Sequence, residues 1–281
     1  MTMIAQGFGE NVVTAFLDGP DNPNIPNAIH STEGAKDYGY KAALVGGVTV
    51  WGWATPTILE AIGDRWLADG WAHIRFRRPT YPGDELTIRV DEADTDGAHE
   101  LRLTKADGEN AIVGVVGLGK APWFAELAQA ERRVPEPVLD ELSPMSLDLA
   151  HAAGDIRPMA TEISTEEARE YAIEKQRMTN PLFVGEHPRV HPGWSTGRMI
   201  RLLHHTFDYG PAIHAQSHIQ HLAPFEAGQT IVQAGRIVDA YERKGHHYAI
   251  LDGMLLGQDG TELVRLRHTT IFQVAKRGQA D

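Results

Sequence analysis

The stretch that decides the fold is residues 73–90, HIRFRRPTYPGDELTIRV, because a related stretch recurs later in the chain. The second copy is residues 218–235, HIQHLAPFEAGQTIVQAG, and the two align without gaps at a pitch of 145 residues, from His73 to His218. Their identical positions are His73/His218, Ile74/Ile219, Pro79/Pro224 and Gly83/Gly228. Self-similarity at a fixed pitch indicates a duplicated structural unit.

A helical pattern precedes each copy. The apolar positions before the first copy follow the 3.6-residue period of a half-buried helix, at Trp51, Thr55, Ile58, Leu59 and Ile62. Before the second copy the same stripe is formed by Met199, Leu202, Leu203 and Phe207. The helix entries Gly46-Gly47 and Pro192-Gly193 align one residue out of pitch. Pro56 predicts a kink in the first helix, with Gly52 placed where the proline ring meets the preceding turn.

Segments rich in β-branched residues follow each copy. The turn signals that divide them are Asp96-Gly97, Asp107-Gly108, Lys244-Gly245 and Asp259-Gly260. Each half is therefore predicted to be an α+β unit, with one helix on one face of a curled antiparallel sheet of about four strands. The proline-rich, acidic residues 135–167 are predicted to be a linker and an entry segment, which divides the chain into units 1–140 and 141–281.

Composition narrows the classes of function. The 281 residues suffice for two domains, and 42% hydrophobic with 23% charged residues is typical of globular proteins. A net charge of −12 disfavours nucleic acid and anionic membrane surfaces as partners. The sequence shows no apolar run of membrane-spanning length and no secretory signal, so a cytoplasmic location is expected. Because Cys is absent, the chemistry must use His, carboxylates, hydroxyls or the backbone.

Several local segments resemble those of the MaoC-like dehydratases, and the resemblance covers most of the chain. In the first half these are Asn27-Ala28-Ile29-His30, Ala35, Gly39-Tyr40, Ala43-Leu44-Val45-Gly46-Gly47 and PTYPGDELTI. In the second half they are Asn180-Pro181-Leu182-Phe183 and His191-Pro192-Gly193. The resemblance implies a tandem, or double, hot-dog fold, in which each central helix is wrapped by a curled sheet. It also implies a hydratase or dehydratase that acts on an acyl-CoA or similar thioester.

In the type 2 enoyl-CoA hydratases that the chain resembles, the motif reads Asp-x-Asn-Pro-Leu/Ile-His, and its Asp and His activate water. In this sequence Asn27 and His30 match the motif, whereas Ile25 stands at the Asp position and Ala28 at the Pro position. His30 is therefore the predicted general acid-base group, and Asn27 is predicted to belong to the same site. Coenzyme A enters only as part of the substrate, and neither a metal nor a redox cofactor is expected.

The second half departs further from the motif. Met178 stands at the Asp position and Phe183 at the His position, and a phenyl ring cannot transfer a proton. One active site per chain is therefore predicted, in the first half. The second half is predicted to bind the acyl group between the units, through Phe183, His191 and Trp194. A homodimer is one assembly that this family allows.

Hydration of an enoyl thioester also needs donors for the thioester oxygen and a partner for the base. The backbone N–H groups of Gly46 and Gly47, at the helix entry, are candidate donors, with close packing as the alternative role. Asp21 is the first candidate for the carboxylate partner of His30, followed by Glu33 and Asp37. Each of these carboxylates is alternatively a solvated charge or a helix cap.

Other polar residues favour simpler roles. His214, His218 and His221 resemble a row of metal ligands, but the period of two in a strand places 214 and 218 on one face and 221 on the other. Arg75 and Arg77 are predicted to face away from the core, either in solvent or against the phosphates of coenzyme A. The alternatives to a hydratase are a thioesterase of the same fold and a non-catalytic protein that binds acyl groups or a partner.

Overall fold

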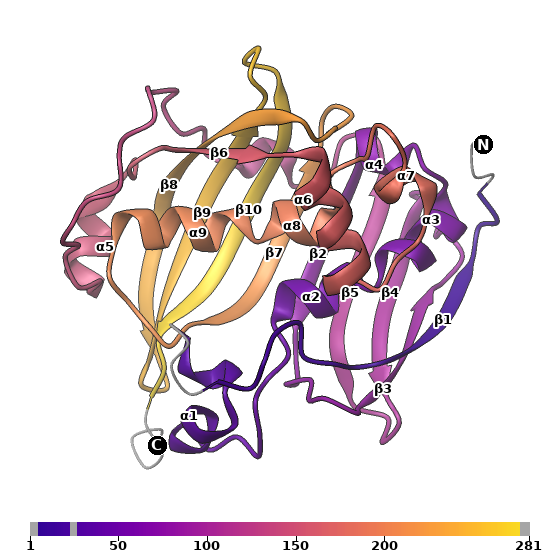
Figure 1. Cartoon of the computed structure of the whole chain (residues 1–281), viewed down its shortest axis with the longest axis horizontal. Helices are drawn as coiled ribbons and strands as arrows, with labels where there is room; N and C mark the ends of the chain where they lie inside the picture. Colours follow the sequence, from indigo (N-terminus) through magenta and orange to yellow (C-terminus); the bar gives the residue numbers. More distant parts are fainter. Residues whose placement is uncertain (1–4, 23–26, 276–281) are drawn as a thin grey trace.

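The computed structural model describes residues 5–22 and 27–275, and these form one antiparallel sheet with most of the helices packed on one face (Figure 1). Within the described residues the sheet has ten strands in the order β1-β3-β4-β5-β2-β7-β10-β9-β8-β6. Their bounds are β1 Gly9–Thr14, β2 Gly70–Phe76, β3 Glu85–Val90, β4 Ala98–Lys105, β5 Asn110–Leu118, β6 Met159–Ile163, β7 Ile213–His221, β8 Gln229–Arg243, β9 His246–Leu256 and β10 Glu262–Gln273. The second five strands repeat the order of the first five in mirror image.

The two halves join where β2 pairs with β7. His73 lies opposite His218 in this antiparallel ladder, and their rings stack with centroids 3.9 Å apart. Because these two residues are also repeat equivalents, a pseudo-two-fold axis passes between them. Trp51 and Thr196, again 145 positions apart, meet on the helix side, where the Trp51 Nε1 donates to the Thr196 Oγ1 at 3.2 Å. The repeat seen in the sequence is therefore the symmetry of the sheet.

Each half carries two short central helices where the sequence predicted one. In the first half α2 breaks before α3, which has Pro56 in its first turn, and in the second half Gly197 separates α8 from α9. Gly52 has a different role from the predicted one, because a Cβ there would collide with the side chain of Gln176 from the other half. The helices are η1 Ala28–His30, α1 Thr32–Asp37, α2 Gly47–Gly52, α3 Thr55–Ile62, α4 Trp66–Asp69, η2 Phe124–Glu126, α5 Leu147–Ala153, α6 Thr165–Glu170, η3 Tyr171–Lys175, α7 Pro181–Val184, α8 Pro192–Thr196 and α9 Arg198–Thr206.

The helix entries follow the repeat without an offset. Helix α2 begins at Gly47 and α8 begins at Pro192, which are 145 residues apart, so the one-residue shift assumed from the sequence is wrong.

The sequence did not predict the two edge strands of the sheet. β1 lies near the start of the chain, and β6 lies inside the predicted linker, which contains α5 and part of α6 as well.

The four predicted turns all connect neighbouring strands. Their glycines have positive φ, at 79°, 87°, 72° and 82° for Gly97, Gly108, Gly245 and Gly260. This backbone conformation strongly favours glycine, which explains why these turns could be located from the sequence. The helical stripes were also placed correctly, since Ile58, Leu59 and the second-half stripe residues Met199, Leu202 and Leu203 are fully buried.

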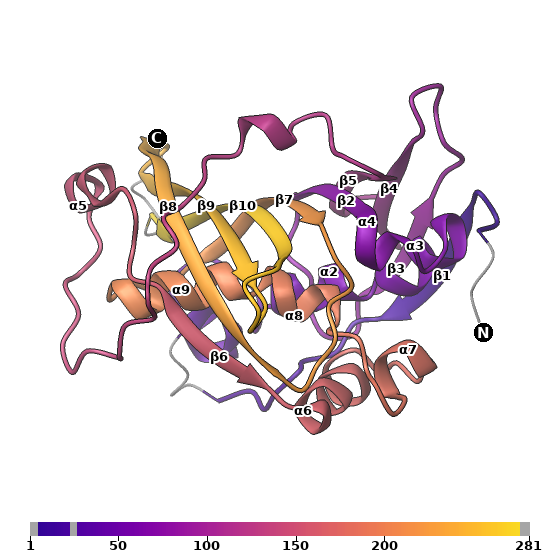
Figure 2. The same ribbon diagram turned by 90° about the horizontal axis from the view of Figure 1, so that it is seen from above.

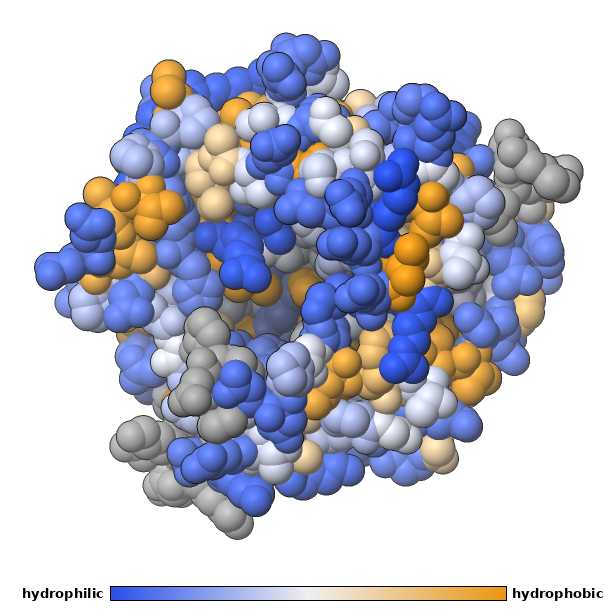
Figure 3. All heavy atoms as spheres, viewed as in Figure 1, coloured by the Kyte–Doolittle hydropathy of each residue, from blue (hydrophilic) through white to orange (hydrophobic). Residues whose placement is uncertain are grey.

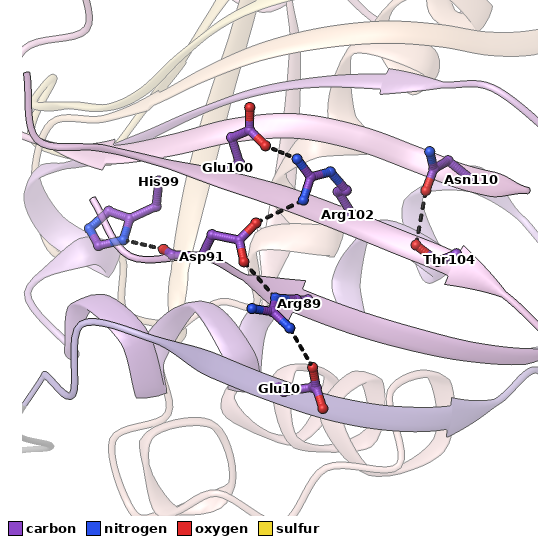
Figure 4. A network of polar contacts seen from close by, with 8 residues as sticks. All are labelled: Glu10, Arg89, Asp91, His99, Glu100, Arg102, Thr104 and Asn110. Atoms are coloured by element: carbon purple, nitrogen blue, oxygen red, sulfur yellow. Dashed lines mark hydrogen bonds and ion pairs between the residues drawn. The ribbon is translucent and has the colours of Figure 1, made fainter. Parts of the chain in front are cut away.

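The outer face of the sheet differs between the halves. Over the second half it is crossed by the connection between the halves (Figure 2), which is held by the buried carboxylate of Asp252. That carboxylate accepts hydrogen bonds from the Ala128 N–H at 2.7 Å and from Arg267 at 2.6 and 2.7 Å. Over the first half the same face carries an ion-pair network of partly exposed side chains (Figure 4), formed by Glu10, Arg89, Asp91, Glu100 and Arg102.

Two half-sheets joined into one sheet, each covering its own central helices and related by a pseudo-two-fold axis, define a double hot-dog fold. The α+β prediction is therefore confirmed. A single core cluster runs through both halves and includes residues of α2, α3, α8 and α9.

Candidate active site

The loop that precedes α2 presents His30. Residues 28–30 form the short helix η1, and Ser31 caps α1 by accepting a hydrogen bond from the Gly34 N–H. The Nδ1 of His30 lies 2.8 Å from the carbonyl oxygen of Leu44. Because a carbonyl oxygen only accepts, Nδ1 must carry the proton, and the neutral ring then keeps a lone pair on Nε2. The Leu44 contact therefore leaves Nε2 as the ring nitrogen that His30 can offer to other groups.

Asn27 fixes this loop to the other half of the molecule. Its Nδ2 donates to the Ala212 carbonyl at 2.9 Å, and its Oδ1 accepts from the Ala212 N–H at 3.3 Å. Both polar ends of the amide are therefore engaged with the backbone of one residue, Ala212, just before β7. In this geometry Asn27 holds in place the loop that carries His30, three residues further on.

A cavity of about 380 Å³ lies beside His30. It opens on the face shown in Figure 3, where the surface is hollowed below α9 and beside α2. First-half residues form one wall, and the ends of β7, β9 and β10 form the opposite wall. The first-half lining includes Asn27, Ile29, His30, Leu44, Val45, Gly46, Gly47, Val50, Phe76, Arg77 and Arg78, and the second-half lining includes Ile200, Ala212, Ile213, His214, His246, Tyr248, Thr270 and Ile271.

The cavity brings together four of the predicted site residues: Asn27, His30, Gly46 and Gly47. Gly46 is the N-cap of α2, and Gly47 is its first residue. A Cβ on Gly47 would lie 3.0 Å from the Phe76 ring, so any larger residue there would require the ring to shift. The proposed role of the two backbone N–H groups as donors to a thioester oxygen stays a prediction.

The predicted carboxylate partners lie elsewhere. The exposed Asp21 accepts a hydrogen bond from the Thr32 N–H at 2.8 Å, and hydrogen bonding to the Thr32 side chain and to this N–H lowers the pKa of its carboxyl group. This places Asp21 at the start of α1, the capping role that was its alternative. Neither Glu33 nor Asp37 lines the cavity, and all the carboxylates of the described residues are missing from its lining. Ile25, at the Asp position of the family motif, lies outside the described residues.

The second-half residues predicted to bind the acyl group do not line this cavity. Phe183 is fully buried, and its ring lies 5.0 Å from that of His191. His191 caps α8 by accepting from the Gly193 N–H at 3.1 Å, and burial lowers the pKa of its ring to about 3. Trp194 packs 6.0 Å from Phe225. All three residues are buried in their own half, with exposed fractions of 9% or less.

Substitution of Phe183 by alanine is accordingly expected to destabilise the fold by about 3–5 kcal/mol, the usual cost of deleting a buried phenyl ring. The reason is the cavity left beside His191. Urea unfolding measures the loss, and Phe124→Ala, in a half-buried position on the outer face, should cost less. A Phe183→Ala variant of native stability with altered acyl-chain preference would restore the pocket role predicted from the sequence.

Two other assignments change with the structure. A bulge between Thr269 and Thr270 shifts the β7–β10 register, so His214 and His221 share the inner face, whereas His218 stacks on His73 at the outer face. The strict period of two had placed His214 with His218 and apart from His221.

Among the described residues, no group of three His, Asp or Glu side chains is arranged to hold a metal ion. In the same part of the chain, no helix has the length and apolar character to cross a membrane.

The arginines in and just after β2 line two different hollows. Arg75 lines a second hollow of about 270 Å³ with His73, Glu100 and Arg102. Arg77 and Arg78, just beyond the end of β2, line the cavity beside His30 instead. Arg78 pairs with Glu109 at 2.9 Å, whereas the Arg77 side chain makes no ion pair with any residue that the structure describes. Arg77 is therefore an available cation at the cavity.

Comparison with solved structures places this fold among known ones. A putative MaoC domain protein dehydratase from Chloroflexus aurantiacus J-10-fl aligns with a TM-score of 0.57 and 16% identity, over 99% of this chain and 95% of that one. A conserved hypothetical protein of Mycobacterium tuberculosis with a double hotdog fold aligns with a TM-score of 0.57 and 15% identity, over 84% of each chain. A putative oleoyl thioesterase from Lactobacillus plantarum aligns with a TM-score of 0.51 and 9% identity, over 95% and 96%.

The chain is thus structurally similar to MaoC-like dehydratases and other double hot-dog proteins, as the sequence resemblance indicated. At these identities the likeness establishes the fold and leaves the activity to the site. No family model matches the sequence, and no curated protein matches it.

Proposed function

We propose that the chain is a hydratase or dehydratase of an enoyl thioester, with His30 as its acid-base group. The observation that carries the proposal is the hydrogen bond from His30 Nδ1 to the Leu44 carbonyl, at the wall of a largely apolar cavity. It fixes the tautomer that leaves Nε2 free to accept a proton. Concave, mostly apolar sites with a few oriented polar groups are typical of small-molecule binding.

Hydration transfers two protons. Water gives one proton to Nε2 of His30 while its oxygen bonds to the β-carbon, and the electron pair of the double bond moves towards the α-carbon, which then takes a proton. Because the cavity lining holds no carboxylate among the described residues, we infer that one imidazole makes both transfers. The proton taken from water is returned to the α-carbon. Dehydration runs the same steps in reverse, and the N–H groups of Gly46 and Gly47 are the proposed donors to the thioester oxygen.

A thioesterase is the second candidate, and the absence of a carboxylate from the described cavity lining favours it. Hydrolysis of a thioester requires one base to activate water against the carbonyl carbon, and His30 without a carboxylate partner meets that need. The third candidate, a protein that only binds acyl groups, requires the same cavity and no proton transfer.

One assay separates the three candidates. Crotonyl-, mesaconyl- and aromatic enoyl-CoA esters are incubated with the protein while the enoyl absorbance and the free thiol are followed separately. A hydratase removes the enoyl absorbance and releases no thiol, whereas a thioesterase releases thiol. Binding in a calorimeter with neither change would identify an acyl-binding protein and refute the proposed reaction.

Arg77 provides a test of the carrier. Its replacement by alanine is expected to raise KM for a CoA thioester about tenfold, equivalent to about 1.4 kcal/mol, with kcat unchanged, because a guanidinium can bind phosphate at the cavity. KM for the N-acetylcysteamine thioester of the same acyl group, which has no phosphate, should not change. Arg75→Ala, at the second hollow, is the matched control. Equal effects on both thioesters would remove the phosphate contact.

A further inference from the structure

Four polar side chains lie together on the inner face of β7 and β10, where the sheet forms one wall of the cavity. In the ladder His214 lies opposite Thr270, and Ser217 lies opposite His268. All four side chains are buried, with exposed fractions of 9% or less. His214 and Thr270 line the cavity directly, and the ring of His268 packs 4.2 Å from that of His214.

This group leaves hydrogen-bonding capacity unused. The Nε2 of His214 is 2.7 Å from the Ser217 hydroxyl, but its Nδ1 has no partner, and neither ring nitrogen of His268 has one. Buried polar atoms are almost always paired, because leaving one unpaired destabilises the folded state. One of these unpaired nitrogens, Nδ1 of His214, belongs to a residue that lines the cavity, and it therefore points to a ligand that supplies its partner.

The chemistry of the partner follows from the state of the rings. Burial lowers the pKa of His214 and of His268, so both rings are neutral, and each offers one donor or acceptor rather than a charge. Neither neutral ring could itself act as the counter-ion of a carboxylate, which would lose its hydration beside them. A hydroxyl or carbonyl oxygen loses far less and can pair with either ring nitrogen.

We propose that the chain bound in this cavity carries an uncharged oxygen, as a hydroxyl or a keto group, and that His214 binds it. This deepens the proposed function, on which it rests, by naming the substrate class: enoyl thioesters with an oxygenated acyl group in preference to plain alkyl chains. His214 is then a specificity-determining residue on the second half, opposite His30 on the first. His268 is a positioning residue that backs the His214 ring.

The test compares acyl chains of equal length. Thioesters of trans-2-enoyl acids with five to seven carbons are prepared with a methyl, a hydroxymethyl, a methyl-ketone or a carboxylate terminus, and kcat/KM is measured for each. We expect the best hydroxyl or keto substrate to exceed its plain counterpart by roughly ten- to a hundredfold, the equivalent of pairing one buried polar group. A plain or carboxylated chain that is used equally well or better overturns the proposal.

The variants locate the preference. His214→Phe keeps a ring against Phe76 and removes the hydrogen bond, so it should abolish the preference while the plain chain is still used. His221→Phe is the matched control, because His221 is buried on the same face of β7 against Trp66 and does not line the cavity. An unchanged preference in His214→Phe overturns the proposal. If that variant does not fold, His214→Gln, which retains a donor, must retain part of the preference.

Binding separates this proposal from the proposed reaction. Calorimetry with hexanamide and 6-hydroxyhexanamide, together with the five- and seven-carbon pairs, measures the cavity without any turnover. Tighter binding of the hydroxylated amides by the wild-type chain, lost in His214→Phe, supports the oxygen site even if no thioester is converted. Equal binding of each pair, alongside normal turnover of plain enoyl thioesters, overturns the oxygen site and leaves the hydratase proposal standing.

Discussion

Replacement of His30 by alanine is expected to lower turnover by a factor of about 10² to 10⁴, the usual contribution of a general acid-base group. The expectation is stronger than for a site with two such groups, because no carboxylate of the described residues lines the cavity to take over the proton. Within residues 5–22 and 27–275, the Leu44 carbonyl alone is the hydrogen-bond partner of the His30 side chain, so the fold should persist without it.

The measurement is kcat with the best thioester from the panel, together with a urea unfolding curve of the same variant. His151→Ala, at an exposed position on α5, is the control and should match the wild type in both. Near-full activity of His30→Ala would assign the chemistry to another residue. A His30→Gln variant, which keeps a polar group without a titrating nitrogen, should be as inactive as the alanine variant.

A steep loss of stability in mild acid is the second large effect. His191, His221 and His268 are buried, and burial lowers the pKa of their rings to about 3, 4 and 3. In the unfolded chain a histidine has a pKa of about 6.5, so below that pH the unfolded state takes up protons that the folded state does not. Stability is therefore complete above pH 6.5 and falls as the pH drops from there towards the folded-state values.

The loss of unfolding free energy follows from the one proton that each histidine ring takes up in the unfolded state. Two such histidines would remove about 4 kcal/mol by pH 5, a large part of the 5–15 kcal/mol typical of a folded domain. Urea unfolding at pH 7.5 and pH 5 measures the difference. His221→Gln should reduce the slope of stability against pH, and His151→Gln, at an exposed position, should leave it unchanged. Equal stability at the two pH values would show that these rings are protonated in the folded chain.

The sequence predicted the fold well where local patterns repeat. Turn glycines with positive φ and helical stripes depend on the local sequence and not on tertiary contacts. Both could therefore be recognised without coordinates. Strand β1 could not, because it pairs with one neighbour only and leaves Val12 exposed, so it lacks the alternation of a buried strand. The β7–β10 bulge escaped for a similar reason, since it changes the face of His214 without any mark in the sequence.

The first-half residues of the site were predictable from the sequence, and the second-half residues were not. Asn27, His30, Gly46 and Gly47 lie within 21 residues of one another, and a family motif marks them. Residues such as His214, Tyr248 and Thr270 come from strands far along the chain, and only the pairing of β2 with β7 brings them to the same cavity. The 145-residue pitch was a signal that the halves pair about an axis, but it does not say which strand ends meet the first-half loop.

The hydrogen bond between Trp51 and Thr196 shows what fusion of the halves makes available. Two identical subunits related by an axis must place the same residue at both equivalent positions, so a Trp would meet a Trp and a Thr would meet a Thr. One continuous polypeptide is free of that constraint and can pair a donor with an acceptor there. The docking of the two halves is also unimolecular, so dilution cannot separate them, and their mutual contact holds at any concentration of the protein in the cell.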